Sequence, residues 1–153
     1  MVEVMFKEKY KEFLDDFGEG RTMVLSTSAN EKVSSRMMSI VQHEGVFYFQ
    51  TDRTMRKYWQ ICENRNVALC IDNIQIEGKA DGAGRPNEHK IFSELFRKQF
   101  KGSADAYSSL DNERVFEVRP TFIQRWLYID GVPYIERFFI NDKRYSLEKY
   151  DGK

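Results

Sequence analysis

Residues 46–62, VFYFQTDRTMRKYWQIC, change from the chemistry of a strand to the chemistry of a helix within a few positions. The run at residues 46–51 is rich in aromatic and β-branched side chains, which is typical of a strand. After it, Tyr58, Ile61 and Cys62 recur at the i, i+3, i+4 spacing of a helical face, so a helix is predicted to begin inside the stretch. A polar segment with three cations therefore lies between a strand end and a helix start.

The polar segment between the strand and the helix has the composition of an anion-binding site. Thr51 and Thr54 are the candidate N-cap hydroxyls of the helix, whose free backbone N–H groups and positive dipole end would gather here. A helix start of this kind binds phosphate groups. Arg56 and Lys57 fall in the first turn, where a cation costs the helix ~0.3–1 kcal/mol unless an anion is present. A surface turn that merely solvates these cations is the alternative, and periodicity alone favours it.

A further cation, Arg36, is expected to reach the same place from the preceding strand, residues 33–42. Residues 44–45, Glu-Gly, are a turn signal between that strand and residues 46–51. Counting back from the turn places Arg36 roughly opposite residues 52–54 in an antiparallel pair. We therefore expect three cations to converge at the helix start.

Outside this region the chain reads as short strands with few helices. Helices are predicted over residues 6–17, where apolar positions share one face, and over residues 87–100, which Asn87 would cap. The remaining predicted strands are residues 22–28, 67–72, 74–80, 115–119, 121–129 and 134–140. A doubly wound parallel sheet would need a helix after nearly every strand, so this order favours a closed or partly closed antiparallel barrel. The polar tail after Asn141 is expected to be loosely held.

Length, composition and charge fit a single domain over residues 1–153 and argue against several classes of partner. Lys plus Arg equals Asp plus Glu at 24 each, so no net field would recruit nucleic acid or an anionic membrane. No stretch approaches the ~20 apolar residues that span a bilayer, and the N-terminus is amphipathic and charged, so we expect a cytoplasmic protein. Cys62 and Cys70 lack metal-ligand spacing; they are expected to be buried free thiols, and no metal site is predicted.

Three segments taken together resemble a known family. They are SSRMMSIV at residues 34–41, FYFQTDRTMRK at residues 47–57 and IQIEGKAD at residues 74–81. In this order they are similar to the flavin-binding core of the pyridoxamine 5′-phosphate oxidase-like superfamily, the split-barrel FMN-binding proteins. The resemblance implies a mainly β fold, a six- to eight-stranded antiparallel Greek-key split β-barrel with flanking helices, and it implies FMN as the cofactor.

The resemblance also assigns flavin contacts residue by residue. The first motif matches residues 36–41, the strand end matches residues 50–51, and the phosphate-binding pair matches residues 56–57. The residues that these segments are expected to bring to FMN are Arg36, Met37, Met38, Ser39, Gln50, Thr51, Arg56 and Lys57.

The family's flavin site lies between the two subunits of a homodimer, and the resemblance implies the same assembly for this chain. Asn73 stands where the oxidases have a Gln that contacts the flavin ring system. Trp126 and Arg137 lie near a C-terminal Trp and Arg that the partner subunit supplies in the family. These three residues complete the set of expected flavin contacts.

The chain departs from the oxidases where they bind their substrate. Val41 replaces the Lys that ends the first motif and contacts the substrate phosphate. Residues 87–107 hold no counterpart of the Tyr, Arg and Ser substrate cluster, and the C-terminal Arg-x-His pattern is missing. Oxidation of pyridoxamine 5′-phosphate is therefore not expected. The chain looks closer to the short bacterial branch of the superfamily, which includes general stress proteins and nitroimidazole-resistance proteins.

Three functions follow as hypotheses. The first is an FMN-dependent oxidoreductase that transfers hydride or electrons between a reduced nicotinamide and a small organic acceptor, with no side chain required as acid or base. The second is a flavin-binding or stress-related protein without turnover. The third is an oligonucleotide-binding barrel, against which the zero net charge argues.

Overall fold

The computed structural model describes residues 2–152, with eight strands and four α-helices in that range. From α1 to β5 the helices and strands follow the order expected from the sequence, beginning with a helix and a three-stranded meander. The elements are α1 (Val2–Phe17), β1 (Gly20–Ala29), β2 (Lys32–His43), β3 (Val46–Asp52), α2 (Arg56–Glu63), β4 (Asn66–Ile71), β5 (Ile74–Gly82), the 3₁₀-helix η1 (Pro86–Glu88), α3 (Lys90–Gln99), α4 (Lys101–Tyr107), β6 (Glu113–Ile129), β7 (Val132–Phe139) and β8 (Arg144–Lys149).

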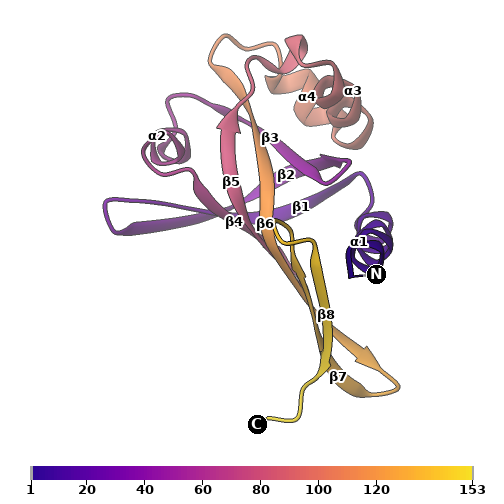
Figure 1. The fold of residues 1–153 in the computed structure, drawn as a ribbon. Coiled ribbons are helices and arrows are strands. Elements are labelled where there is room, and N and C mark those ends of the chain that lie inside the picture. Colours follow the sequence, from indigo (N-terminus) through magenta and orange to yellow (C-terminus); the bar gives the residue numbers. More distant parts are fainter. Residues whose placement is uncertain (1, 153) are drawn as a thin grey trace.

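The strands form an antiparallel sheet that closes on itself. Their order is β3-β2-β1-β4-β5-β6-β7-β8, and an additional pairing of β3 with β6 closes the first six strands into a barrel. Strands β7 and β8 continue from the second half of β6 as an arm, residues 121–149, which extends below the barrel (Figure 1). This mainly β architecture with flanking helices confirms the predicted split barrel.

Strand β6 joins the barrel to the arm because it bends in its middle. Its first half pairs with β3 and its second half pairs with β7. The register against β5 shifts between Glu77 and Gly78, opposite Pro120. A proline lacks the N–H that a regular ladder needs, so it is tolerated at such an irregularity. The sequence predicted two strands here, because Pro120 reads as a break, and the structure makes one bent strand.

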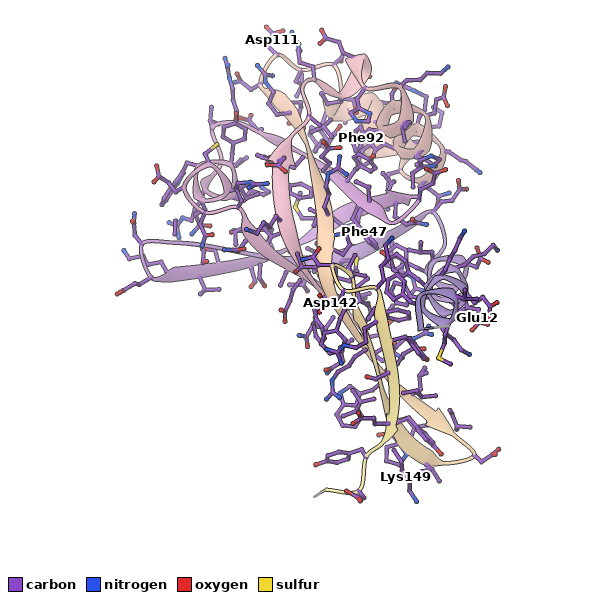
Figure 2. All side chains as sticks on the ribbon, in the orientation of Figure 1. Glu12, Phe47, Phe92, Asp111, Asp142 and Lys149 are labelled. Carbon is purple, nitrogen blue, oxygen red and sulfur yellow. The ribbon has the colours of Figure 1, made fainter. Side chains whose placement is uncertain are left out.

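Aromatic side chains pack on both faces of the barrel wall. Helix α1 lays Phe13 and Phe17 over the larger, inner core, where Phe17 meets Phe47 edge to face with ring centroids 5.2 Å apart. Helices α3 and α4 cover the outer face of β2 and β3, where Phe92 and Phe96 join a second cluster with Val41 and Tyr48. Figure 2 shows Phe92 between α3 and the barrel strands and Phe47 near the middle of the molecule. Helix α1 therefore packs against the core of the barrel, whereas α3 and α4 pack against the outside of its wall.

Several local predictions were wrong, each for a local reason. The tail after Asn141 is not loose, since β8 pairs along β7. The helix expected at residues 87–100 begins at Lys90 instead, where His89 is the N-cap and its Nδ1 accepts a hydrogen bond from the Phe92 backbone N–H at 3.1 Å. A second helix, α4, follows it directly.

Cys62 and Cys70 are exposed, contrary to the sequence-based expectation. In β4 the alternation of a strand turns Val67 and Leu69 inward and Cys70 outward, although the apolar run suggested burial on both faces. In α2 the buried positions are Gln60 and Ile61 rather than Cys62. Within residues 2–152 no helix is long and apolar enough to cross a membrane.

Candidate functional site

The start of α2 differs in detail from the capped helix that the sequence predicts. Neither Thr51 nor Thr54 caps it; the N-cap position is Met55, and no side chain caps the helix. Both the backbone N–H and the hydroxyl of Thr54 donate to Oδ1 of Asp52, each at 2.7 Å. Asp52 thus forms a tight turn that takes Thr54 away from the helix. The first turn of α2, which begins at Arg56, therefore has no side-chain cap, and its free backbone N–H groups remain available to an anion.

Three cations converge at this helix start. Burial and the nearby charge of Arg56 lower the pKa of the Arg36 guanidinium. Burial and the charge of Arg36 lower the pKa of the Lys57 ammonium, although Glu113 and Asp52 act in the opposite direction. Repulsion of this kind indicates that the positive charge is incompletely neutralised by the protein itself.

The strand pairing that was expected to bring Arg36 here is absent. The β2–β3 ladder covers only three residue pairs, from Val41↔Tyr48 to His43↔Val46, so it ends before it reaches Arg36. Arg36 pairs with Leu25 of β1 instead. It meets the helix start because α2 packs across β1, and not through the predicted hairpin register.

A cavity of about 250 Å³ lies beside the cations. Its walls come from β2, β3, the loop before α2, helices α3 and α4, and the first residue of β6. Six of the residues predicted to contact flavin line it: Met37, Met38, Ser39, Gln50, Thr51 and Lys57. The remaining lining residues are Asp52, Met55, Phe96, Ser103, Tyr107 and Glu113. These six residues and the neighbouring cations Arg36 and Arg56 make eight of the eleven predicted residues that the structure brings to one region.

The amide of Gln50 is held at the wall of this cavity. Its Oε1 accepts a hydrogen bond from the Ser108 hydroxyl at 2.7 Å, and both residues are buried. Since Oε1 is used as the acceptor, the amide nitrogen is the end that remains to donate to a bound molecule. Within the described part of the chain, this nitrogen donates to no other group.

The sequence did not point to four residues in the wall. Phe96, Ser103 and Tyr107 come from α3 and α4, and no local motif marks them, since their contribution depends on how the two helices pack on the outer face of the barrel. Glu113 is the first residue of β6 and is buried. Burial and the charge of Asp52 raise the pKa of its carboxyl, while Lys57 partly offsets them. In the sequence Glu113 is a lone acidic residue next to Arg114, and such a pair does not mark a binding site.

Asn73, Trp126 and Arg137 lie in a second region. Nδ2 of Asn73 donates to the Trp126 carbonyl oxygen at 2.7 Å, and both residues border a cavity of about 180 Å³. Nε of Arg137 donates to Oε1 of Gln124 at 3.2 Å, and Gln124 lines the same cavity. None of the three lines the first cavity. Within one chain, the structure therefore does not bring this group to the cation cluster.

Comparison with solved structures finds the same fold in several proteins. General stress protein 26 from Bacillus anthracis strain Sterne is 28% identical, with a TM-score of 0.58 over 76% of this chain and 90% of that chain. PhzG from Burkholderia lata 383, in complex with tetrahydrophenazine-1-carboxylic acid, is 14% identical, with a TM-score of 0.63 over 97% and 91%. A pyridoxamine 5′-phosphate oxidase-related, FMN-binding protein from Nostoc punctiforme PCC 73102 is 12% identical, with a TM-score of 0.59 over 86% and 87%.

Comparison of the sequence itself gives one family. No curated protein matches the chain significantly. The family model described as pyridoxamine 5′-phosphate oxidase matches residues 6–127, which is well over half of the chain and includes the cation cluster and the first cavity. Together with the closed six-stranded barrel, this match shows that the chain belongs to the pyridoxamine 5′-phosphate oxidase-like family of split barrels.

Proposed function

We propose that this protein binds FMN and acts as an oxidoreductase that transfers hydride or electrons between a reduced nicotinamide and a small organic acceptor. The observation that carries the proposal is the convergence of Arg36, Arg56 and Lys57 at the uncapped start of α2, beside a cavity. Arg56 lowers the pKa of Arg36, and Arg36 lowers the pKa of Lys57; repulsion of this kind is relieved when a phosphate arrives between the cations. The residues present therefore fit the phosphate end of FMN.

Each wall of the cavity has a proposed part in holding the cofactor. The three cations neutralise the phosphate, and the Thr51 hydroxyl donates a hydrogen bond to it. The backbone of residues 37–39 and the amide nitrogen of Gln50 meet the ring system. When bound, FMN supplies the hydride or electron chemistry, and the protein supplies orientation and the local charge that tunes it. The Nostoc relative, an FMN-binding protein, supports this choice of cofactor.

A second copy of the chain is proposed to complete the site. The first cavity, about 250 Å³, is smaller than the ~300–1,000 Å³ typical of pockets for ligands of this size. Asn73, Trp126 and Arg137 form their own cluster away from it. A homodimer in which the partner subunit brings its second region over the first cavity would unite all the expected flavin contacts.

The substrate is proposed to be something other than pyridoxamine 5′-phosphate. Val41 stands where the oxidases have a substrate-binding Lys, and it is fully buried against the cluster under α3. A buried valine offers neither charge nor access to a substrate phosphate. The proposal is therefore limited to a small organic acceptor, and the tetrahydrophenazine-1-carboxylic acid bound to PhzG is an example of a small organic ligand on this fold.

A flavin-binding protein without turnover is the second candidate. The 28% identity to a general stress protein favours it, and the cavity geometry supports it equally. Turnover separates the two candidates. The purified protein, loaded with FMN, is mixed with a reduced nicotinamide and a nitro or quinone acceptor, and nicotinamide oxidation is followed by absorbance.

The oxidoreductase proposal predicts oxidation that depends on both FMN and the acceptor. Flavin binding without acceptor-dependent oxidation would leave the second candidate. A protein that gains no flavin absorbance after incubation with FMN and removal of free flavin would contradict both.

A further inference from the structure

Arg36 is held by a buried threonine. Its Nη1 donates to the Thr27 hydroxyl at 2.8 Å and to the Leu25 carbonyl oxygen at 3.2 Å. Thr27 is only 1% exposed, and it lies on the inward face of β1, between Leu25 and Ala29 in the alternation of that strand. Within residues 2–152, hydrogen bonds of this guanidinium are made through Nη1 alone. Nε and Nη2 therefore remain to meet an anion.

Thr27 in turn makes a hydrogen bond to helix α2. Its hydroxyl donates to Oε1 of Gln60 at 2.6 Å, and Nε2 of Gln60 donates to the Ser34 hydroxyl at 3.4 Å. The direction of this chain is fixed, because a guanidinium can only donate. The single hydroxyl proton of Thr27 must then point at Gln60. Gln60 is also 1% exposed, so neither residue has solvent to replace a lost partner.

Gln60 stands on the helix that carries the other two cations. Helix α2 is eight residues long, and Gln60 lies four positions after Arg56 and three after Lys57. Residues at these spacings share a helical face. The chain from Arg36 through Thr27 to Gln60 therefore ties the cation on β2 to the helix whose first turn holds the others.

We propose that Thr27 and Gln60 are positioning residues that assemble the three cations before the cofactor phosphate arrives. Without such a tie, repulsion would turn the Arg36 side chain away from Arg56 and Lys57. The hydrogen-bond chain keeps the guanidinium beside the helix start, so no rearrangement is needed on binding. The inference rests on the proposed function, because it assigns the cluster to the phosphate of FMN.

Replacement of the buried hydroxyl tests the proposal. Thr27→Val removes the hydroxyl while keeping the shape, and Thr27→Ser restores it. Binding of FMN and of riboflavin, which differ by the phosphate, is measured by quenching of flavin fluorescence. We expect Thr27→Val to weaken FMN binding about tenfold or more and to leave riboflavin binding unchanged. Thr27→Ser should bind FMN within about threefold of the unmodified protein.

Two further variants keep the test falsifiable. Ser26→Ala removes a hydroxyl from the opposite face of β1, where Ser26 pairs with Ser35 at 2.8 Å, and should leave both affinities unchanged. Gln60→Met breaks the hydrogen-bond chain at its other end and should reproduce the FMN-specific loss. Thermal unfolding of the flavin-free protein shows whether Thr27→Val folds, and Gln60→Met carries the test if it does not.

The outcomes separate the inference from the function on which it rests. Equal loss of FMN and riboflavin affinity in Thr27→Val and Gln60→Met would show a purely structural role and overturn the inference alone, as would unchanged affinities. An unmodified protein that binds FMN no more tightly than riboflavin would overturn the phosphate site itself and the inference with it.

Discussion

Removal of the Glu136 carboxylate should strongly destabilise the fold, because this buried group links the three strands of the arm. One oxygen accepts a hydrogen bond from Nε of Arg125 at 2.8 Å, and the other accepts one from the Tyr145 hydroxyl at 2.7 Å. Arg125 and Glu136 keep only 12% and 5% of their side-chain surface exposed. Arg125 also reaches Asp16 of α1 at 3.2 Å. Residues of β6 and β8 thus meet at one carboxylate of β7, and Arg125 connects this cluster to α1.

The expected loss of stability follows from the groups that lose their partner when the Glu136 carboxylate is removed. Glu136→Ala leaves a largely buried guanidinium without its main partner, which typically costs ~3–5 kcal/mol. The remaining contact with exposed Asp16 lowers that cost, and the lost bond from Tyr145 adds ~1 kcal/mol. We expect Glu136→Ala to lower the free energy of unfolding by about 3–4 kcal/mol. Glu136→Gln keeps the shape and one acceptor and should cost less.

Urea unfolding of the flavin-free protein, followed by tryptophan fluorescence, measures this change. Glu148→Ala is the matched control: its carboxylate lies 3.8 Å from Arg137 and is 69% exposed, so its removal should change the free energy of unfolding by less than ~0.5 kcal/mol. A Glu136→Ala variant within ~1 kcal/mol of the unmodified protein would refute the reasoning that this buried cluster stabilises the strands of the arm.

Two other predictions follow from the barrel and the cavity. Gly78→Ala should lower the free energy of unfolding by ~1–3 kcal/mol, because the added Cβ would lie 2.6 Å from a backbone carbonyl oxygen, whereas Gly82→Ala meets nothing within 4 Å and should be nearly neutral in urea unfolding. The Glu113 carboxyl has a raised pKa in the folded protein. At pH values between its unfolded and its folded pKa, the folded protein binds more protons than the unfolded chain, so stability falls as pH rises through this window. Glu113→Gln should remove that fall in unfolding experiments across pH and should tighten FMN binding severalfold; an unchanged pH profile would contradict the assignment.

Much of the fold could be predicted because the sequence alternates strand and turn signals clearly. The meander over residues 22–51 and the helix starting near Arg56 appear where the pattern placed them. Errors arose where two principles compete. Pro120 reads as a strand break but sits at a bulge opposite Gly78, and the apolar run before Cys70 suggested burial where strand alternation exposes the thiol. Strand β8 was missed because its outer positions are polar and only Tyr145 packs against the core.

The site could be predicted in part because its phosphate end is local in sequence. Arg56 and Lys57 follow Thr51 closely in the sequence, so a short motif can mark them. Arg36 was expected there for the wrong reason, since packing of α2 across β1 brings it close, and strand register does not. The buried contact of Thr27 with Gln60 joins residues 33 positions apart and has no signature in the sequence.

The central claim is that the cation cluster binds the phosphate of FMN, and one titration tests it most directly. FMN affinity is measured for the unmodified protein, for the double variant Arg56→Ala with Lys57→Ala, and for a charge-matched control, Lys9→Ala with Lys11→Ala on the exposed face of α1. Loss of charge-assisted contacts should weaken FMN binding by at least ~1.5–3 kcal/mol in the first variant and leave the control unchanged. FMN affinity that is the same in all three proteins would contradict the claim and would mean that Arg56 and Lys57 are only solvated cations of a surface turn.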